Sequence, residues 1–232
     1  SEMFIDIPSS KKEMDEIEDK MSFWKDFKGG IQFVRGQRQI MILMSFALVL
    51  NFLFNPIFAI IFPKTIKFTL GLGAKEFGVF EAIFSIGAMI GMLLLSIMPK
   101  REKNYRLMLF GITIQSLIIV LFGIPIIPVI YNKINNFHVF IVFCILVFSM
   151  MVFNSLTNVP ILTTFQKKVP DEYRGRFFGM LNTLSQGIVP IGLALIGALS
   201  DILLPSTIFI VAGLISLSLS IWMIFIPELR EL

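Results

Sequence analysis

The stretch QIMILMSFALVLNFLFNPIFAIIFP, residues 39–63, decides the fold class, because it runs for 25 residues between Arg38 and Lys64 without a charged side chain. A helix needs about 20 mostly apolar residues to cross the roughly 30 Å hydrocarbon core of a bilayer. A membrane β-strand would instead show polar and apolar residues in alternation, and this stretch does not. The stretch therefore predicts a membrane-spanning helix.

Five further stretches repeat this pattern between clusters of charged residues. The sequence predicts an all-α membrane protein, with a cytoplasmic linker over residues 1–38 and a six-helix transmembrane bundle over residues 39–232. The expected helices cover residues 40–62, 76–98, 106–129, 138–164, 175–199 and 205–227.

The composition excludes several other classes of protein. Hydrophobic residues make up 56% of the chain and charged residues 16%, against about 25% charged residues in soluble domains. One Cys and one His leave little material for a disulfide or a metal site. The phosphate-loop, zinc-protease and serine-hydrolase motifs are absent from the sequence, so we expect no enzyme activity, no cofactor and no bound metal.

The basic residues predict the orientation in the membrane. Six spans place both ends of the chain on one side, and that side holds 16 of the 20 Lys and Arg residues. The other four are Lys64, Lys67, Lys75 and Lys133. Because basic loops stay in the cytoplasm, both ends are expected to be cytoplasmic, with the chain in the inner or plasma membrane. Basic loops beside a membrane are better explained by topology and anionic lipid than by nucleic acid, so the bilayer is the expected partner.

The first 38 residues differ from the rest and hold eight of the 16 acidic residues. Trp24, Phe27, Ile31 and Val34 recur at helical spacing among basic residues. This pattern favours an amphipathic helix that lies among the lipid headgroups. The alternative is a solvated linker that leads into the first span.

Polar side chains inside the spans are the candidate functional residues, because they are costly in a membrane. Glu81 is the one clear ionisable case, and its alternative is a place near the interface where it pairs with Lys75 or simply reaches water. Amides four residues apart share one helix face, and they can bind a substrate or hydrogen-bond to another helix. Gln115 stands alone in the third span. The substrate-cavity candidates are Asn51, Asn55, Glu81, Asn154, Asn158, Asn182 and Gln186.

Small residues mark the second and fifth spans as inner helices that pack closely or gate. The residues concerned are Gly87, Gly91, Gly187, Pro190 and Gly192. These two spans are the middle members of two successive groups of three. This placement is typical of a three-plus-three inverted repeat, as found in the six-span halves of transporters.

Two cytoplasmic segments resemble a known family. Residues 23–34, FWKDFKGGIQFV, resemble the central-loop helix that precedes the seventh helix of major facilitator superfamily exporters. Residues 169–179, VPDEYRGRFFG, resemble their loop between helices ten and eleven, with Arg174, Gly175 and Arg176 as the loop motif. The chain as a whole resembles the C-terminal half, helices seven to twelve, of the drug- and macrolide-efflux branch.

The resemblance implies a secondary transporter with twelve spans when complete. Its partners would be an N-terminal six-helix half and a small, largely apolar molecule, exported by alternating access coupled to a proton or ion gradient. The cavity would lie between the halves and be faced by helices seven, eight, ten and eleven. All seven candidates lie on the four matching spans, whereas Gln115 lies on a span that the resemblance makes peripheral. The alternatives are a permease subunit of an ATP-driven transporter and a membrane assembly factor that transports nothing.

Overall fold

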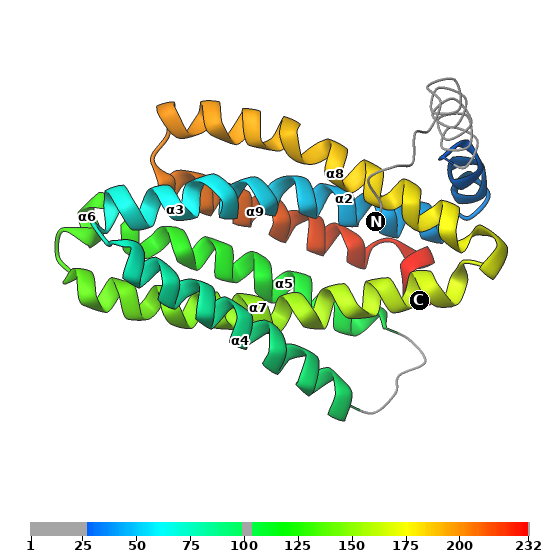
Figure 1. Cartoon of the computed structure of the whole chain (residues 1–232), viewed down its shortest axis with the longest axis horizontal. Helices are drawn as coiled ribbons and strands as arrows, with labels where there is room; N and C mark the ends of the chain where they lie inside the picture. The colour runs from blue at the N-terminus through cyan, green and yellow to red at the C-terminus, as the bar shows by residue number, and fades with distance from the viewer. Residues whose placement is uncertain (1–26, 99–103, 232) are drawn as a thin grey trace, which may run out of the picture.

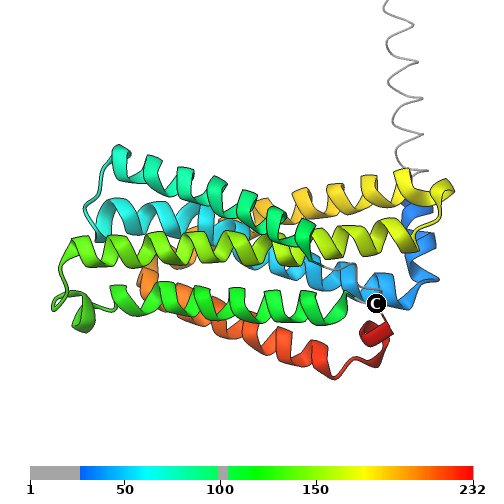
Figure 2. The ribbon, with the colours of Figure 1, turned by 90° about the horizontal axis from the view of Figure 1, so that it is seen from below.

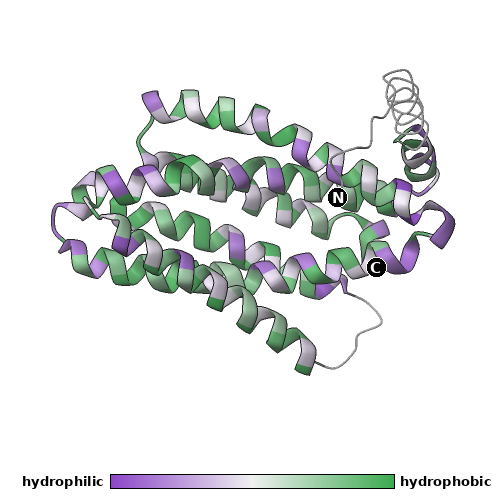
Figure 3. Cartoon of the chain, in the orientation of Figure 1, coloured by the Kyte–Doolittle hydropathy of each residue, from purple (hydrophilic) through white to green (hydrophobic). Residues whose placement is uncertain are grey.

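The computed structural model describes residues 27–98 and 104–231, and most of them are helical (Figure 1). The described residues contain six helices that are long and apolar enough to span a membrane, which confirms the predicted fold class. These spans are Arg38–Thr69, Ala74–Ile97, Tyr105–Ile126, Asn136–Lys168, Asp171–Ile202 and Pro205–Ile224. Hydrophilic residues gather mainly toward the two ends of the bundle (Figure 3).

The first span is longer than the sequence predicts and runs to Thr69 rather than ending near residue 62. It consists of α2 (Arg38–Pro56), η1 (Ile57–Ile61), α3 (Phe62–Lys64) and η2 (Thr65–Thr69), of which η1 and η2 are π-helical. A proline lacks the N–H that closes a regular helical turn. Here Pro56 and Pro63 are each followed by wider π turns, so the helix continues where a stop was expected.

The other elements are separated by short connections, so consecutive spans run antiparallel to one another. Asn135 caps the fourth span by accepting a hydrogen bond from the Phe137 N–H. Pro205 begins the sixth span, where its missing N–H has no helical partner to lose. The elements are α4 (Ala74–Ile97), α5 (Tyr105–Gly123), η3 (Ile124–Ile126), α6 (Pro128–Tyr131), α7 (Asn136–Lys168), α8 (Asp171–Ile202), α9 (Pro205–Ile224) and η4 (Pro227–Glu231).

The packing of the spans follows the two groups of three. Helix α4 packs on α7, α8 packs on α2, and α5 packs on both α9 and α7. The second helix of each group thus lies against the first helix of the other group, as an inverted repeat requires. Figure 2 shows α4 and α8 on one side of the bundle and α5 and α9 on the opposite side.

Close approach of α4 and α7 depends on two glycines. A methyl group on Gly91 would lie 2.7 Å from both the Ser155 Cβ atom and the Val152 carbonyl oxygen. Gly87 meets the backbone of α7 one turn away in the same manner. The approach lets the Ser155 hydroxyl donate a hydrogen bond of 3.1 Å to the Ala88 carbonyl. These contacts fit the packing role that the sequence predicts for Gly87 and Gly91.

In α8 the contacts fit the expected packing role at Gly192. A methyl group on Gly192 would lie 2.6 Å from the Pro56 ring, so this glycine lets α8 approach α2. Gly187 has open space around it, and Pro190 is exposed. Gly187 and Pro190 therefore lie on a face of α8 that does not meet α2, and a packing or gating role for them stays a prediction.

The described part of the N-terminal segment is helical over residues 27–35 and packs on protein. Val34 is 3% exposed within an apolar cluster that includes Phe177 and Met180 of α8. Phe33 stacks on Tyr173 with 5.1 Å between ring centroids. The interfacial helix predicted from the sequence thus turns part of its apolar face to α8 and not to headgroups, while Trp24 lies outside the described residues.

The two described ends of the chain lie at the same end of the bundle (Figure 1). There Arg38 of α2 forms a 3.0 Å ion pair with Glu228, and Arg174 pairs with Asp171 and donates a 3.0 Å hydrogen bond to the Gln166 carbonyl. Gly175 of the same loop motif is exposed with open space around it. Arg174 thus joins the start of α8 to the end of α7.

Replacing Gly91 with Ala tests the α4–α7 contact. We expect the variant to lower the free energy of unfolding by about 1–3 kcal/mol, because the added methyl group overpacks the interface. Titration of the purified chain with SDS in mixed micelles measures this quantity. The matched control is Gly78→Ala in the same helix, where a methyl group meets nothing within 4 Å. Equal stability of the two variants would contradict the account.

Candidate functional site

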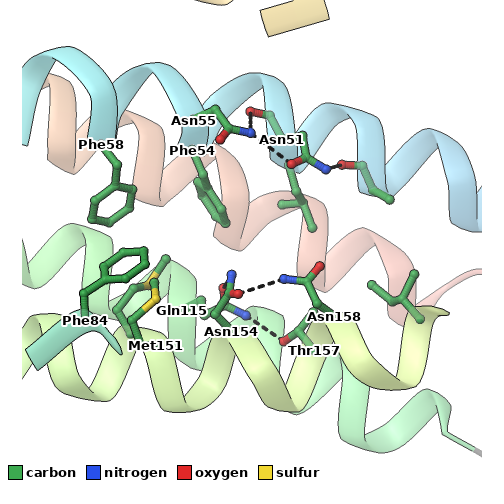
Figure 4. Close-up of a pocket in the computed structure, with 14 residues that line it drawn as sticks. Asn51, Phe54, Asn55, Phe58, Phe84, Gln115, Met151, Asn154, Thr157 and Asn158 are labelled. Carbon is green, nitrogen blue, oxygen red and sulfur yellow. Dashed lines mark hydrogen bonds between the residues drawn. The ribbon is translucent and has the colours of Figure 1, made fainter. Parts of the chain in front are cut away.

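A cavity of about 280 Å³ lies among the first four spans (Figure 4). Its polar lining consists of Asn51 and Asn55 from α2, Gln115 from α5, and Asn154, Thr157 and Asn158 from α7. Its apolar lining includes Phe54, Phe58, Phe84, Met150, Met151 and Ile161. The lining contains amides, a hydroxyl and apolar groups but no charged side chain, so its chemistry suits an uncharged molecule that is partly apolar.

One wall of the cavity carries a directed chain of hydrogen bonds. The Asn158 amide donates to the Asn154 side-chain oxygen at 2.9 Å, and the Asn154 amide donates to the Gln115 oxygen at 3.4 Å. The Gln115 amide in turn donates to the Thr157 hydroxyl at 2.6 Å. The Thr157 hydroxyl donates to the Phe153 carbonyl, which ends the chain on backbone. Each amide is therefore held in one orientation. The series of hydrogen bonds starts at Asn158, which is exposed.

The opposite wall is formed by two amides that bond within their own helix. The Asn55 amide donates to the Asn51 side-chain oxygen at 3.0 Å, and the Asn51 amide donates to the Ala47 carbonyl at 2.9 Å. Of the two interpretations given to the amide pairs, interhelix bonding applies to Asn154 through Gln115. It does not apply to Asn51 and Asn55, whose side-chain amides donate only to groups of α2 among the described residues.

Gln115 is the site residue that the sequence analysis missed. It was set apart because its span was assigned to the periphery, yet its side chain is 3% exposed and joins α5 to α7. A lone amide in an apolar span is costly unless another helix satisfies it. The presence of a lone amide in an apolar span could therefore have indicated a bond to another helix. Its partner, Thr157, is 42 residues away in the sequence, so spacing could not identify it.

The remaining candidates lie around this cavity. Asn182 lines a neighbouring cavity of about 400 Å³ together with Asn51 and Asn158. Glu81 lines a third cavity of about 200 Å³, which shares Phe58 and Phe84 with the amide cavity. Gln186 is exposed on α8 and lines none of these three. The structure thus brings together four of the seven candidates and places two more beside them.

Glu81 is exposed on α4 and forms no ion pair with Lys75. Of the alternatives offered for it from the sequence, its exposure fits contact with water and not the pair with Lys75, and a role in the transport cavity stays a prediction. At the same end of the bundle, Lys64 of α3 is held by α8. Its ammonium group donates to the Ser200 carbonyl at 2.5 Å and lies 3.6 Å from the Asp201 carboxylate.

Comparison with known families identifies the fold. The sequence profile of the Major Facilitator Superfamily matches residues 5–192 and, in a second alignment, residues 44–231. The chain belongs to the major facilitator superfamily. It is therefore a multi-pass membrane protein of a transporter family and not an enzyme.

Two kinds of relative show where this major facilitator chain lies within the superfamily. Macrolide efflux protein A of Streptococcus pyogenes is 24% identical over 91% of this chain and 49% of its own length. The multidrug efflux pump Tap of Mycolicibacterium fortuitum is 29% identical over 88% of this chain and 46% of its own length. The chain thus spans about half the length of the curated relatives it matches. No solved structure matches it.

A double-mutant cycle tests the hydrogen bond between Gln115 and Thr157. We expect Gln115→Leu to lower the free energy of unfolding by about 1–2 kcal/mol, because buried hydrogen-bonding groups lose their partner. Combining it with Thr157→Val should cost less than the sum of the single changes by about 0.6–1.7 kcal/mol. Thr163→Val is the control for the second change, since the Thr163 hydroxyl donates only within its helix, to Val159. Additive costs for Gln115 and Thr157 would contradict the network.

Proposed function

We propose that the chain is the C-terminal half, helices seven to twelve, of a major facilitator exporter. In this proposal it joins an N-terminal six-helix half, and the two halves move a small, largely apolar molecule out of the cell by alternating access. A proton or ion gradient drives the movement. The curated relatives support the direction, since their names describe efflux, and their length supports the missing half.

The exposed face of α8 is the observation that carries the proposal. In the most apolar 18-residue segment of α8 only 11% is buried inside the protein, whereas 56% of the corresponding segment of the third span is buried. Between Gly179 and Pro190 the exposed residues of α8 are polar or small, which is unsuited to lipid contact. This polar stripe consists of Gly179, Asn182, Thr183, Gln186, Gly187 and Pro190. A stripe of this kind is what a helix needs when it faces another half and an aqueous cavity between them.

The second helix on the same side, α4, has the same low burial. Only 17% of its most apolar segment is buried. Helices α4 and α8 lie on the same side of the bundle in Figure 2, at opposite edges of it in Figure 1. The amide cavity lies between α2 and α7, the two helices on which α8 and α4 pack. A partner half on this side would therefore place the cavity near the middle of the complete transporter.

The cavity supports a substrate that is uncharged over most of its surface. Six phenylalanine, methionine and isoleucine side chains named above provide apolar contact, and the amides provide hydrogen bonds that fix an orientation. The side-chain amide groups of Asn154 and Gln115 already donate hydrogen bonds to the protein. The side-chain oxygens of Asn55 and Asn158 accept no hydrogen bond from the described residues. We propose that these two oxygens accept hydrogen bonds from the substrate.

The basic residues support cytoplasmic ends. Arg38, Arg106, Lys167, Lys168 and Arg174 all fall at the end of the bundle where both described chain ends lie. The opposite end holds Lys64, Lys67, Lys75 and Lys133. Membership of the superfamily argues against the ATP-driven permease, and no observation favours an assembly factor.

Reconstitution tests the need for a second half. We expect vesicles that contain only this chain to export no fluorescent macrolide derivative under an imposed proton gradient, because the chain provides one wall of the transport path. Vesicles that also contain the proposed N-terminal six-helix half should export it. Adding a proton ionophore is the control, and it should abolish the export.

Two outcomes would contradict this proposal. Export by the chain alone would show that a second half is not needed. No export with both halves present, when circular dichroism shows both to be helical, would show that the assembly is not an exporter of this compound class.

A further inference from the structure

The third cavity, which contains Glu81, has an unusual lining. It measures about 200 Å³ and is surrounded by Phe58, Phe62, Phe77, Phe80 and Phe84, with Glu81 as its one charged group. We call it the phenylalanine box. None of the amide or hydroxyl side chains that line the amide cavity lines the box, whose remaining member is Val147. The box therefore offers a ligand aromatic rings and one carboxylate.

Helical spacing builds the box from two spans. Phe80, Glu81 and Phe84 lie three, four and seven residues after Phe77, so all four share one face of α4. Phe58 and Phe62 are four apart in the first span, and the Phe62 ring contacts the Phe80 ring of α4. Phe58 belongs to the wider π turn Ile57–Ile61, and Phe62 directly follows that turn.

The rings of the box are fixed by packing. Phe62 packs edge-on against Phe80 with 5.4 Å between centroids, and Phe80 packs against Phe140 at 5.1 Å. Phe62 is 6% exposed and Phe80 is 1% exposed. Phe84 is 38% exposed and forms the open side. The box is thus preformed in this conformation, so binding would cost little conformational entropy in its side chains.

Both kinds of group in the box attract the same type of ligand. The face of an aromatic ring carries negative potential and binds cations within about 6 Å of its centroid, and cages of such rings bind alkylammonium groups. A carboxylate in a membrane span is costly without a positive partner. Among the described residues no Lys or Arg forms an ion pair with Glu81. The nearby ammonium of Lys64 is bound to Ser200 and Asp201, and that of Lys67 lies over the Phe68 ring.

We propose that the phenylalanine box binds an alkylammonium group of the transported molecule. This inference rests on the proposed function. Phe58 and Phe84 line both the box and the amide cavity, so one molecule can occupy both. Its uncharged, hydrogen-bonding body would lie against Asn55 and Asn158, and its positive group would lie against Glu81. The proposal assigns substrates that are organic cations with an apolar body.

Direct binding tests the box without requiring transport. The probes are choline and its uncharged isostere 3,3-dimethylbutan-1-ol, titrated into the purified full chain in detergent and followed by saturation-transfer NMR of the methyl signals. We expect choline to bind saturably and the isostere to bind at least about tenfold more weakly. Equal binding of the two probes, or no saturable binding of choline, would overturn the proposal.

Two variants locate the bound cation. Glu81→Gln should weaken choline binding about tenfold, because the amide keeps the shape and removes the charge. Phe84→Leu should weaken it as well, since Phe84 is the exposed ring. The matched control is Glu76→Gln on the same helix, where the side-chain oxygen that accepts from the Gly73 N–H is retained. If Glu81→Gln and Glu76→Gln bind choline equally while thermal unfolding shows both to be folded, the box is not the cation site.

An efflux comparison separates this inference from the proposed function. In vesicles that contain both halves, a fluorescent dye with a trimethylammonium tail and its uncharged tert-butyl analogue are compared. With Glu81→Gln we expect export of the cationic dye to fall about tenfold and that of the uncharged dye to be unchanged. Equal loss of both would overturn the inference. Absence of export in the unsubstituted protein would contradict the proposed function, while the binding titration would still decide on the box.

Discussion

Hydrocarbon offers no hydrogen-bond partner, and the arrangement of this protein follows from that constraint. The backbone satisfies its own hydrogen bonds by forming helices, which continue past Pro56 and Pro63 with π turns. Buried polar side chains form hydrogen bonds to neighbouring helices. Gln115 joins α5 to α7, and the Ser116 and Ser216 hydroxyls share a 2.7 Å hydrogen bond between α5 and α9. Among the described residues no buried side-chain nitrogen or oxygen lacks a partner.

The same constraint explains why small residues hold the bundle together. Lipid is as apolar as the helices, so association depends on close van der Waals contact and on interhelix hydrogen bonds. Gly87 and Gly91 bring α4 onto α7, and Gly192 brings α8 onto α2. Where bulky rings and amides face one another instead, the spans stay apart, and the amide cavity and the phenylalanine box occupy the space. The distribution of small and large residues along the spans therefore determines both where the helices pack closely and where the cavities form.

Much of the fold could be predicted from the sequence, and the site only in part. The six spans follow from gaps between charges, and Asn51, Asn55, Asn154 and Asn158 were found because polar groups are rare in spans. The role of Gln115 was missed because its partner lies in another helix, a contact that periodicity does not encode. Periodicity likewise does not show that Gly187 and Pro190 lie on the face of α8 turned away from α2. Docking of residues 27–35 on α8 depends on Gly30, which approaches the Arg176 carbonyl, a contact between distant segments that spacing along the sequence does not reveal.

The central claim is that the polar stripe of α8 faces a second six-helix half. Photo-crosslinking in the complete transporter tests it most directly, with a benzophenone amino acid placed at Gln186, near the midpoint of α8, or at Leu214 of α9, which is 51% exposed. Mass spectrometry then identifies what each position has captured. The account predicts protein crosslinks to the other half from position 186 and lipid adducts from position 214. Lipid adducts from position 186, with no crosslink to a second half, would contradict it.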